Sequence, residues 1–230
     1  MRLEVMISKQ LPEFMIDIDF SCDDGRLVAL TGPSGAGKTT IIRCIAGLEQ
    51  PDQGRIHYNG HCWFDSSRGI MQAARNRGIG YVFQEHTLFP HLNIAGNVAF
   101  ACSDHGQVND LLKTFGIDRL GHRYPHQVSG GERQRAALAQ ALASNPKVLL
   151  LDEPFSALDP ETRTILRREL KELKERLTLP IIMVTHDQAE ADFLSDQQLA
   201  IQHGHPVPVI CQGDTFPCPT SSLLADLPAS

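Results

Sequence analysis

The chain of 230 residues has no long hydrophobic run. Its longest apolar stretches, such as "VLLL" at 148–151 and "IIMV" at 181–184, have the length of buried strands. A helix that spans a bilayer needs roughly 18 or more apolar residues. The first ten residues, "MRLEVMISKQ", also lack the apolar core of a signal peptide. We therefore expect a cytoplasmic protein whose role at a membrane, if it has one, comes through a partner.

An excess of positive charge is also missing. The chain has 21 Lys and Arg against 27 Asp and Glu, which gives a net charge of −6 at pH 7. Proteins that coat nucleic acid carry a basic stripe, so we expect no nucleic-acid partner. The six cysteines contain no C-x-x-C pair. We interpret them as free thiols that pack as small hydrophobic side chains in a reducing compartment.

Short apolar segments alternate with helical patterns along most of the chain. The segments at 26–32, 79–84, 147–154 and 179–187 predict strands. A helix is predicted after Asp159, its N-cap, and Pro160, and its leucines recur at helical spacing at 166, 170, 173 and 177. Strands that alternate with helices predict a parallel sheet with right-handed crossovers.

One segment interrupts this alternation. From residue 85 to residue 143 the strand signals fade, and short helical pieces are predicted at 94–101 and 109–115. We interpret 85–143 as an inserted helical subdomain. Residues 1–84 and 144–230 then form the core of a single domain that covers 1–230, a size that fits one α/β domain.

The segment "GPSGAGKTT" at 32–40 matches the phosphate-binding pattern G-x-x-x-x-G-K-[ST], with a strand before it and a helix after it. Glycines let backbone N–H groups turn toward phosphate oxygens at the helix N-terminus. The lysine would place its charge on the β- and γ-phosphates, and the threonine would offer its hydroxyl to Mg²⁺. The predicted nucleotide-binding residues here are Gly32, Pro33, Ser34, Gly35, Ala36, Gly37, Lys38, Thr39 and Thr40.

Two acidic residues follow the apolar strand at 147–154. Asp152 lies where a carboxylate ligand of Mg²⁺ belongs, and Glu153 is the natural general base for an attacking water. The alternative for Glu153 is a cap or an ion pair at the end of the strand. After an apolar strand, and together with the phosphate loop, the two acids predict an NTPase that uses Mg²⁺.

A second glycine pair, in "VSGGERQR" at 128–135, precedes a helix predicted at 132–143. Ser129 and Glu132 have the spacing of a capping box, which accounts for those two residues. It does not account for Gly130 and Gly131, because adjacent glycines are costly in entropy and expose the backbone. We therefore predict that something approaches this helix N-terminus closely, as a γ-phosphate would.

Together these motifs resemble the ATP-binding cassette (ABC) ATPases. "VSGGE" is similar to the family signature L-S-G-G-Q, and "YVFQ", "LLLDEP", "SALD" and "VTHD" resemble the glutamine loop, Walker B strand, D-loop and switch-histidine motifs in their family order. The resemblance covers nearly the whole chain. It implies an α/β fold: a RecA-like phosphate-loop NTPase core with a parallel sheet, an N-terminal antiparallel β portion and an inserted α-helical subdomain.

The resemblance also implies an ATPase with ATP and Mg²⁺ bound between two copies that pair head to tail. Each ATP would lie between the phosphate loop of one copy and residues 129–131 of the other. Gln84 would contact Mg²⁺ and the attacking water, and His186 would hold the γ-phosphate and orient Glu153. Asp159 would bridge the two copies. The alternative for each of these residues is a surface or helix-cap role.

Residues 75–101 resemble the importer ATPases, in which the segment after the glutamine loop receives a helix of a membrane permease. Phe89, Pro90, His91 and Leu92 would line that groove, or would be ordinary core under a helical lid. "GHCWFDSSRGI" at 60–70 looks most like molybdate importers, so we expect uptake of molybdate or a related oxyanion; sulfate, polyamine and metal are alternatives. The implied partners are a second copy, permease subunits at the inner face of the cell membrane and, indirectly, a solute-binding protein.

Besides Val128 and Glu132 in the signature, the chain lacks two features that are common in the family. No tyrosine or tryptophan precedes the phosphate loop, so Phe14 is the nearest candidate to stack on adenine, with core packing as the alternative. No C-terminal regulatory β-domain, which many molybdate-type cassettes carry, is expected.

Three competing functions are a soluble ABC ATPase of repair or translation, an exporter cassette and a non-catalytic nucleotide-binding regulator. The first usually carries a long coiled-coil insertion or two cassettes, and neither is present. The second often comes fused to membrane helices. The presence of Lys38, Asp152, Glu153 and His186 argues against the third.

Overall fold

A computed structural model describes residues 1–84, 88–102 and 105–207. The strands are β1 (Arg2–Gln10), β2 (Met15–Asp23), β3 (Leu27–Thr31), β4 (Gln53–Tyr58), β5 (His61–Asp65), β6 (Ile70–Met71), β7 (Ile79–Val82), β8 (Val148–Asp152), β9 (Ile181–Val184), β10 (Gln197–Gln202) and β11 (His205–Val207). The helices are α1 (Lys38–Ala46), α2 (Ala74–Arg77), α3 (Ile94–Ala101), α4 (His105–Thr114), α5 (Gly130–Ala143), α6 (Pro160–Arg176) and α7 (Gln188–Leu194), with 3-10 turns η1 (Asp118–Leu120) and η2 (Pro125–Gln127). Cys211 and Cys218 lie outside the described residues. The segment that concerns the predicted absence of a C-terminal β-domain lies outside them as well.

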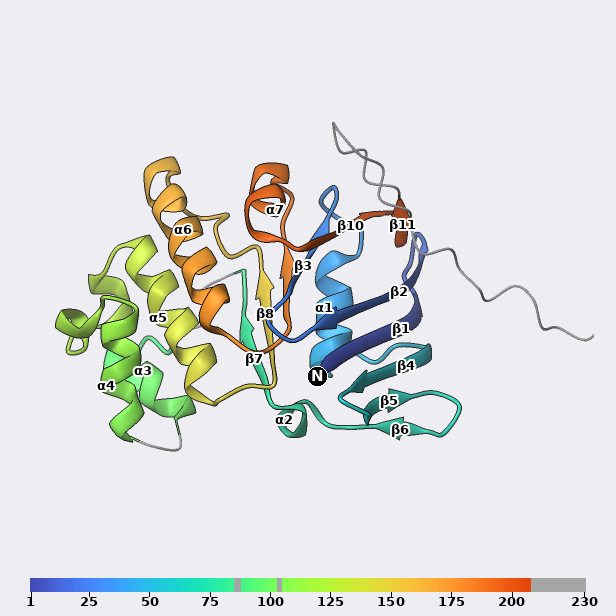
Figure 1. The fold of residues 1–230 in the computed structure, drawn as a ribbon, viewed down its shortest axis with the longest axis horizontal. Helices are drawn as coiled ribbons and strands as arrows, with labels where there is room; N and C mark the ends of the chain where they lie inside the picture. Colours follow the sequence, from blue (N-terminus) through green and yellow to red (C-terminus); the bar gives the residue numbers. More distant parts are fainter. Residues whose placement is uncertain (85–87, 103–104, 208–230) are drawn as a thin grey trace, which may run out of the picture.

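A five-stranded antiparallel sheet, in the order β2-β1-β4-β5-β6, forms one side of the molecule (Figure 1). Along β1 the side chains of Leu3, Val5 and Ile7 are buried, whereas Arg2 and Glu4 are exposed. This alternation is typical of a sheet that has one face on the core and one face in water. The predicted N-terminal antiparallel portion is therefore confirmed.

The central sheet has six strands in the order β11-β10-β3-β9-β8-β7. The pairs from β10 to β7 are parallel, and β11 is an antiparallel edge strand. All residues of β3, β8 and β9 are buried, because both faces of the sheet are covered. This confirms the predicted parallel sheet, whose carboxyl ends lie along one edge.

Each face of the parallel sheet has its own core. Val28 and Leu30 of β3 pack with α1 and the antiparallel sheet. Leu27 and Ala29 of the same strand pack with α3 to α7 on the opposite face. Figure 1 shows the result: the antiparallel sheet and α1 lie on one side of the parallel sheet, and α3, α5 and α6 lie on the other. The helices α1 and α5 are therefore separated by the sheet.

The helix predictions hold in most details. Helix α3 has the predicted bounds, α4 begins four residues earlier than predicted, and α5 begins at Gly130 rather than at residue 132 because Ser129 is its N-cap. Asp159 caps α6 as predicted and accepts a hydrogen bond from the Thr162 N–H at 3.0 Å. In the described part of 85–143 the regular elements are all helical, and the bounds of a separate subdomain remain a prediction. Among the described residues, no helix has the length and apolarity that a membrane span requires.

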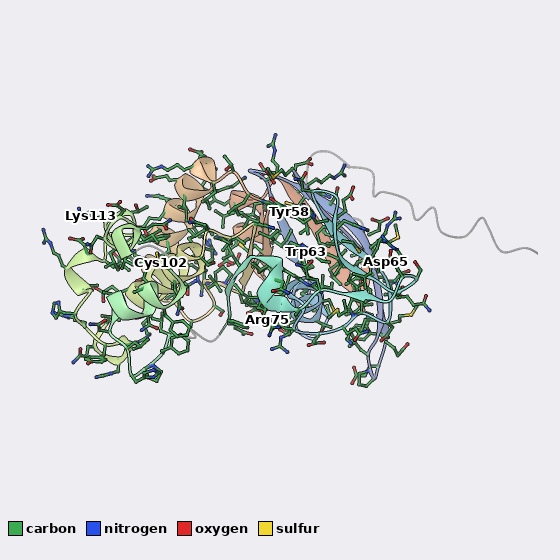
Figure 2. The ribbon with its side chains drawn as sticks, turned by 90° about the horizontal axis from the view of Figure 1, so that it is seen from below. Tyr58, Trp63, Asp65, Arg75, Cys102 and Lys113 are labelled. Carbon is green, nitrogen blue, oxygen red and sulfur yellow. The ribbon has the colours of Figure 1, made fainter. Side chains whose placement is uncertain are left out.

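The C-terminal end of α1 rests on a buried arginine. The Arg77 side chain is fully buried, and its guanidinium donates hydrogen bonds to the carbonyls of Cys44 and Ile45 at 2.9 and 2.7 Å. It also lies 5.9 Å from the ring centre of Trp63, which stacks on Tyr58. In Figure 2 Tyr58 and Trp63 lie at the antiparallel end of the molecule, away from Cys102 and Lys113 at the helical end. A positive charge at a helix C-terminus is favourable, so Arg77 helps to hold the phosphate-loop helix in place.

Candidate functional site

The phosphate loop connects the carboxyl end of β3 to the N-terminus of α1. Gly35 and Gly37 have φ angles of 81° and 97°, a region that favours glycine. Gly37 is the N-cap of α1, and no side chain from residues 1–84, 88–102 or 105–207 caps this helix. The first N–H groups of α1 therefore lack a side-chain acceptor, which leaves them able to bind an anion.

The Lys38 side chain folds back over the loop. It is only 4% exposed, and its Nζ donates hydrogen bonds to the carbonyls of Gly32 and Pro33, both at 2.7 Å. Burial lowers the pKa of Lys38, and the negative charges of Glu153 and Asp152 act in the opposite direction. The cation thus has two neutral acceptors, which phosphate oxygens can replace with a stronger charge-assisted contact.

Asp152, the last residue of β8, lies between two hydroxyl groups. Its Oδ1 accepts a hydrogen bond from Thr39 Oγ1 at 3.1 Å, and its Oδ2 accepts one from the Tyr81 hydroxyl at 3.3 Å. Burial raises the pKa of Asp152, whereas the two donors act to lower it. Burial, followed by the charge of Asp152, raises the pKa of Tyr81, so its phenol remains protonated.

Three residues predicted to be catalytic meet at Glu153, which directly follows Asp152. Glu153 Oε2 lies 3.2 Å from His186 Nδ1 and 3.4 Å from Gln84 Nε2. Glu153 has a φ of 46°, an unusual conformation for a residue with a side chain. Its N–H donates to the Val184 carbonyl at 3.0 Å, which fixes the strained backbone against β9.

The backbone around His186 is held by a network that the sequence analysis missed. Thr185 Oγ1 donates to Glu190 Oε2 at 2.6 Å and accepts from the Asp187 N–H at 3.1 Å. Arg167 of α6 donates to both Asp187 and Glu190, at 2.7 and 2.9 Å. Asp187 caps α7, as its side chain accepts from Ala189 N–H at 2.9 Å. Among the described residues, the Glu190 carboxylate does not bond back to the Asp187 N–H as in a capping box, because it binds Thr185 and Arg167 instead.

The signature residues lie at the N-terminus of α5. The Ser129 N–H donates to Glu132 Oε2 at 2.7 Å, and Ser129 Oγ accepts from the Glu132 N–H at 3.3 Å, so the capping box is complete. A Cβ at Gly131 would lie 2.5 Å from Thr162 Cγ2 of α6. At Gly131 the close neighbour is thus another helix of the same chain, and the approach of a γ-phosphate to this helix N-terminus remains a prediction.

The surface proposed for a membrane partner is partly exposed. Phe89 packs on Phe100 of α3 at a ring-centre distance of 4.6 Å and lies 5.9 Å from the ring of His91. Phe100 is 68% exposed and was missed by the sequence analysis. The buried Asn97 holds the segment, since its side chain accepts from the Phe89 N–H at 2.6 Å and donates to the Leu92 carbonyl at 3.1 Å. Pro90 and His91 are exposed rather than buried under a lid.

Phe14 lies beside the phosphate loop. It is partly buried against the core of the antiparallel side, and its ring is edge-on to that of His203, at 6.1 Å. A Cβ at Gly37 would be 3.4 Å from the Phe14 ring. Core packing, the alternative for this residue, is therefore present, and the ring also lies close to the N-terminus of α1.

The oxygen ligands at the start of α1 and the end of β8 fit Mg²⁺. The Thr39 hydroxyl and the Asp152 carboxylate are hard oxygen ligands of the kind that Mg²⁺ prefers. No group of three or more His, Cys, Asp and Glu side chains in the described ranges could hold a metal ion. Phosphate oxygens and waters would have to complete the coordination, as is usual for Mg²⁺ bound with a nucleotide.

Comparison with known proteins places the chain in a family. Residues 15–156 match the family model described as ABC transporter. The chain is 46% identical over 208 residues to the sulfate/thiosulfate import ATP-binding protein CysA of Synechococcus elongatus, covering 86% of this chain and 59% of that protein. It is 40% identical over 230 residues to a probable sulfate/thiosulfate import ATP-binding protein of Chlorella vulgaris, covering 96% and 95%. It is also 40% identical over 234 residues to the molybdenum import ATP-binding protein ModC of Albidiferax ferrireducens, covering 98% and 61%.

Two solved structures share the fold. One is a dimeric ATP-binding cassette in a post-hydrolysis state bound to ADP and Pi, at 28% identity and a TM-score of 0.71, covering 89% of this chain and 95% of that one. The other is cbiO1 from Clostridium perfringens, part of the ABC transporter complex cbiONQ, at 28% identity and a TM-score of 0.77, covering 89% and 86%. The chain spans only about three fifths of the length of several relatives. The family model matches more than half of the chain, and the fold agrees, so the chain belongs to the ABC transporter family.

Proposed function

We propose that the chain is the ATP-hydrolysing subunit of an ABC importer. The observation that carries this proposal is the convergence of Lys38, the Thr39–Asp152 pair and the Glu153–His186 pair at the carboxyl ends of β3, β8 and β9. These residues supply a cation for phosphate, oxygen ligands for a metal and a carboxylate base, which are the parts that phosphoryl transfer to water requires.

The phosphate loop would bind ATP first. Lys38 would leave the carbonyls of Gly32 and Pro33 and bind the β- and γ-phosphates, while the uncapped N–H groups of α1 bind phosphate oxygens. Thr39 and Asp152 would hold Mg²⁺. A metal held by these two residues would supply positive charge that neutralises the phosphates.

Glu153 would act as the general base. Its carboxylate accepts a proton from the water that attacks the γ-phosphorus, and the products are ADP and phosphate. His186 and Gln84 already contact the same oxygen, Oε2, so they fix the direction of the carboxylate and can contact the γ-phosphate and the attacking water. The strained backbone at Glu153 restricts the side chain further.

A second copy would complete each site. The parallel sheet separates α1 from α5, so the phosphate loop and residues 129–131 of one chain belong to opposite faces. Head-to-tail pairing would bring Ser129, Gly130 and Gly131 of one copy to the ATP of the other, and Asp159 would lie at the junction. The similarity to a dimeric cassette supports this arrangement.

A permease would dock on the surface formed by Phe89, His91 and Phe100. His91 and Phe100 are exposed and Phe89 is partly exposed, and aromatic side chains that pack on one another at a surface are typical of a protein interface. The import function named for the relatives supports a permease as the partner. The chain would then lie at the inner face of the membrane through this contact, with a solute-binding protein delivering the solute from the other side.

The solute is best assigned as sulfate or thiosulfate. Relatives at 40–46% identity carry the sulfate/thiosulfate name more often than the molybdenum name. The expectation of molybdate is thus not confirmed, although the oxyanion class is supported. Since the cassette does not contact the solute, the sequence at 60–70 is weak evidence for one anion over another.

The test is transport by the assembled complex. The chain would be co-expressed with its permease and solute-binding protein, placed in vesicles and assayed for ATP turnover and for uptake of labelled sulfate and molybdate. Turnover stimulated by sulfate supports the proposal, and stimulation by molybdate alone overturns the assignment of the solute. An absence of turnover with Mg²⁺ and ATP, in a complex that contains the permease, would overturn the enzymatic function.

A further inference from the structure

Tyr81 touches the carboxylate that we expect to hold Mg²⁺. It is the first residue of the "YVFQ" segment, in which the sequence analysis assigned a role only to Gln84. It lies on β7, which pairs with β8 in parallel, and its hydroxyl is 3.3 Å from Asp152 Oδ2. The other oxygen of Asp152 accepts from Thr39 at 3.1 Å. Asp152 is only 3% exposed. Each oxygen of its carboxylate therefore has its own hydrogen-bond donor, one from a strand and one from a helix.

We propose that Tyr81 is a positioning residue for Mg²⁺: its hydroxyl fixes the orientation of the Asp152 carboxylate, and its ring supports the strand end that carries Gln84. This inference rests on the proposed function and adds a residue to it. Groups that bind a metal ligand from behind typically change metal affinity by about 10–100-fold when they are removed.

The two hydroxyls that hold Asp152 have different duties. Thr39 would also bind the metal, so its oxygen has to serve Mg²⁺ and Asp152 together. Tyr81 is required for no other part of the proposed chemistry, and its contact with Asp152 can persist whether or not nucleotide is bound. The hydroxyl of Tyr81 therefore keeps Oδ2 engaged and leaves Oδ1 directed at the position shared with Thr39.

The ring of Tyr81 has a separate contact. It stacks on Phe83 with ring centres 4.0 Å apart and 26° between the planes. Phe83 directly precedes Gln84, whose Nε2 lies 3.4 Å from Glu153 Oε2. One side chain thus contacts the expected metal ligand through its hydroxyl and the glutamine loop through its ring, and these two roles can be separated by substitution.

The experiment compares Tyr81→Phe with Tyr81→Leu. A fluorescent ATP analogue is bound to each purified variant, and Mg²⁺ is titrated from zero in a metal-free buffer. For Tyr81→Phe we expect the Mg²⁺ concentration at half-saturation to rise by about tenfold, with unchanged binding of the analogue in EDTA. Tyr81→Leu should show the same shift in Mg²⁺, and in addition a lower kcat at saturating Mg²⁺ because Gln84 loses its support.

Tyr58→Phe is the matched control. Tyr58 is another tyrosine with a stacked ring. It is buried, whereas Tyr81 is partly buried, and it stacks on Trp63 in the antiparallel sheet (Figure 2). Its variant should leave the Mg²⁺ titration unchanged. Thermal unfolding without metal shows whether each variant folds.

The outcomes separate this inference from the proposed function. If Tyr81→Phe requires the same Mg²⁺ concentration as the wild type, the proposed role of the hydroxyl is wrong. A shift in Tyr81→Leu alone would assign the effect to the ring, and the role of the hydroxyl would again be wrong. The titration reports metal binding in the absence of hydrolysis. A protein that binds Mg²⁺ with the analogue but does not turn over ATP would therefore contradict the enzymatic function while leaving the test of Tyr81 readable.

Discussion

The chain has two glycine-rich helix N-termini, and they differ in how their own chain satisfies them. At α1 the N-cap is Gly37 in the left-handed conformation. Within the described part of the chain no side chain caps this helix, and Lys38 donates to the neutral carbonyls of Gly32 and Pro33. At α5 the capping box of Ser129 and Glu132 is complete, and Gly131 packs against α6. The first terminus is left open for a ligand, and the second is largely occupied by its own fold.

The difference shows that similar glycine patterns can have different physical causes. In the phosphate loop, glycine is required by left-handed φ angles. At Gly131, glycine is required because a side chain would collide with α6. Gly131 is buried, whereas Gly130 is half-exposed and its Cβ would make a tight but less severe contact, 3.3 Å from Leu158, so Gly130 is the member of the pair that faces outward. A role of α5 in binding the nucleotide of a second copy therefore depends on Ser129 and Gly130 more than on Gly131.

The largest effect is expected from Glu153→Gln, which acts on the open site. The amide cannot accept a proton from water, so turnover should fall by about 10²–10⁴-fold. Binding of ATP should persist, and the variant should form an ATP-dependent dimer that gel filtration resolves. Glu175→Gln, at an exposed position of α6, is the control. A variant that remains monomeric with ATP would contradict the shared site.

Ser129→Arg tests the capped site. It should lower turnover by about 100-fold or more, because a bulky cation would stand where the other copy presents its γ-phosphate. Binding of a fluorescent ATP analogue should stay at the wild-type level, since the sheet separates α5 from α1. Ser144→Arg, at the exposed C-terminal end of the same helix, is the control. Weaker binding of the analogue would mean that Ser129 supports the fold of its own chain.

The two glycines of the capped site can be compared directly. Gly131→Ala should lower the free energy of unfolding by about 1–2 kcal/mol, because overpacking against Thr162 exceeds the gain in helix propensity. Gly130→Ala should be close to neutral for stability and should instead lower turnover. Denaturant unfolding measures both. Adding Thr162→Ser, which removes the obstructing methyl, should restore stability to Gly131→Ala; without this rescue, the close contact is not the cause.

The smallest effect is expected at Asp159, the cap of the neighbouring helix α6. Asp159→Ala removes the acceptor for the Thr162 N–H and should lower Tm by about 2–4 °C. Asp159→Asn keeps an acceptor and should change Tm less. If Asp159→Asn weakens ATP-dependent dimerisation at an unchanged Tm, the residue bridges the two copies; equal dimerisation would leave it a helix cap.

Local patterns predicted much of the fold correctly. The caps of α5 and α6 and the phosphate loop between β3 and α1 depend on residues within a few positions of one another. Asp187 and Glu190 also have the spacing of a capping box, but only one half of it is among the described interactions: the Asp187 side chain accepts from the Glu190 N–H, and the Glu190 carboxylate bonds elsewhere. Glu190 has Arg167 and Thr185 as partners, and a charged partner from another helix is favoured over a backbone N–H.

The sequence by itself determined the family, the parallel sheet and the identity of most of the proposed site residues, because those features follow from short motifs and from the apolar pattern of each strand. The antiparallel sheet was implied by the family resemblance alone. Only the tertiary structure decided which atoms meet. It placed Tyr81 on Asp152, gave Gly131 a neighbour in α6 and set α1 and α5 on opposite faces of one sheet. Such contacts join residues far apart in the chain, and their distances depend on how strands and helices pack rather than on any local pattern.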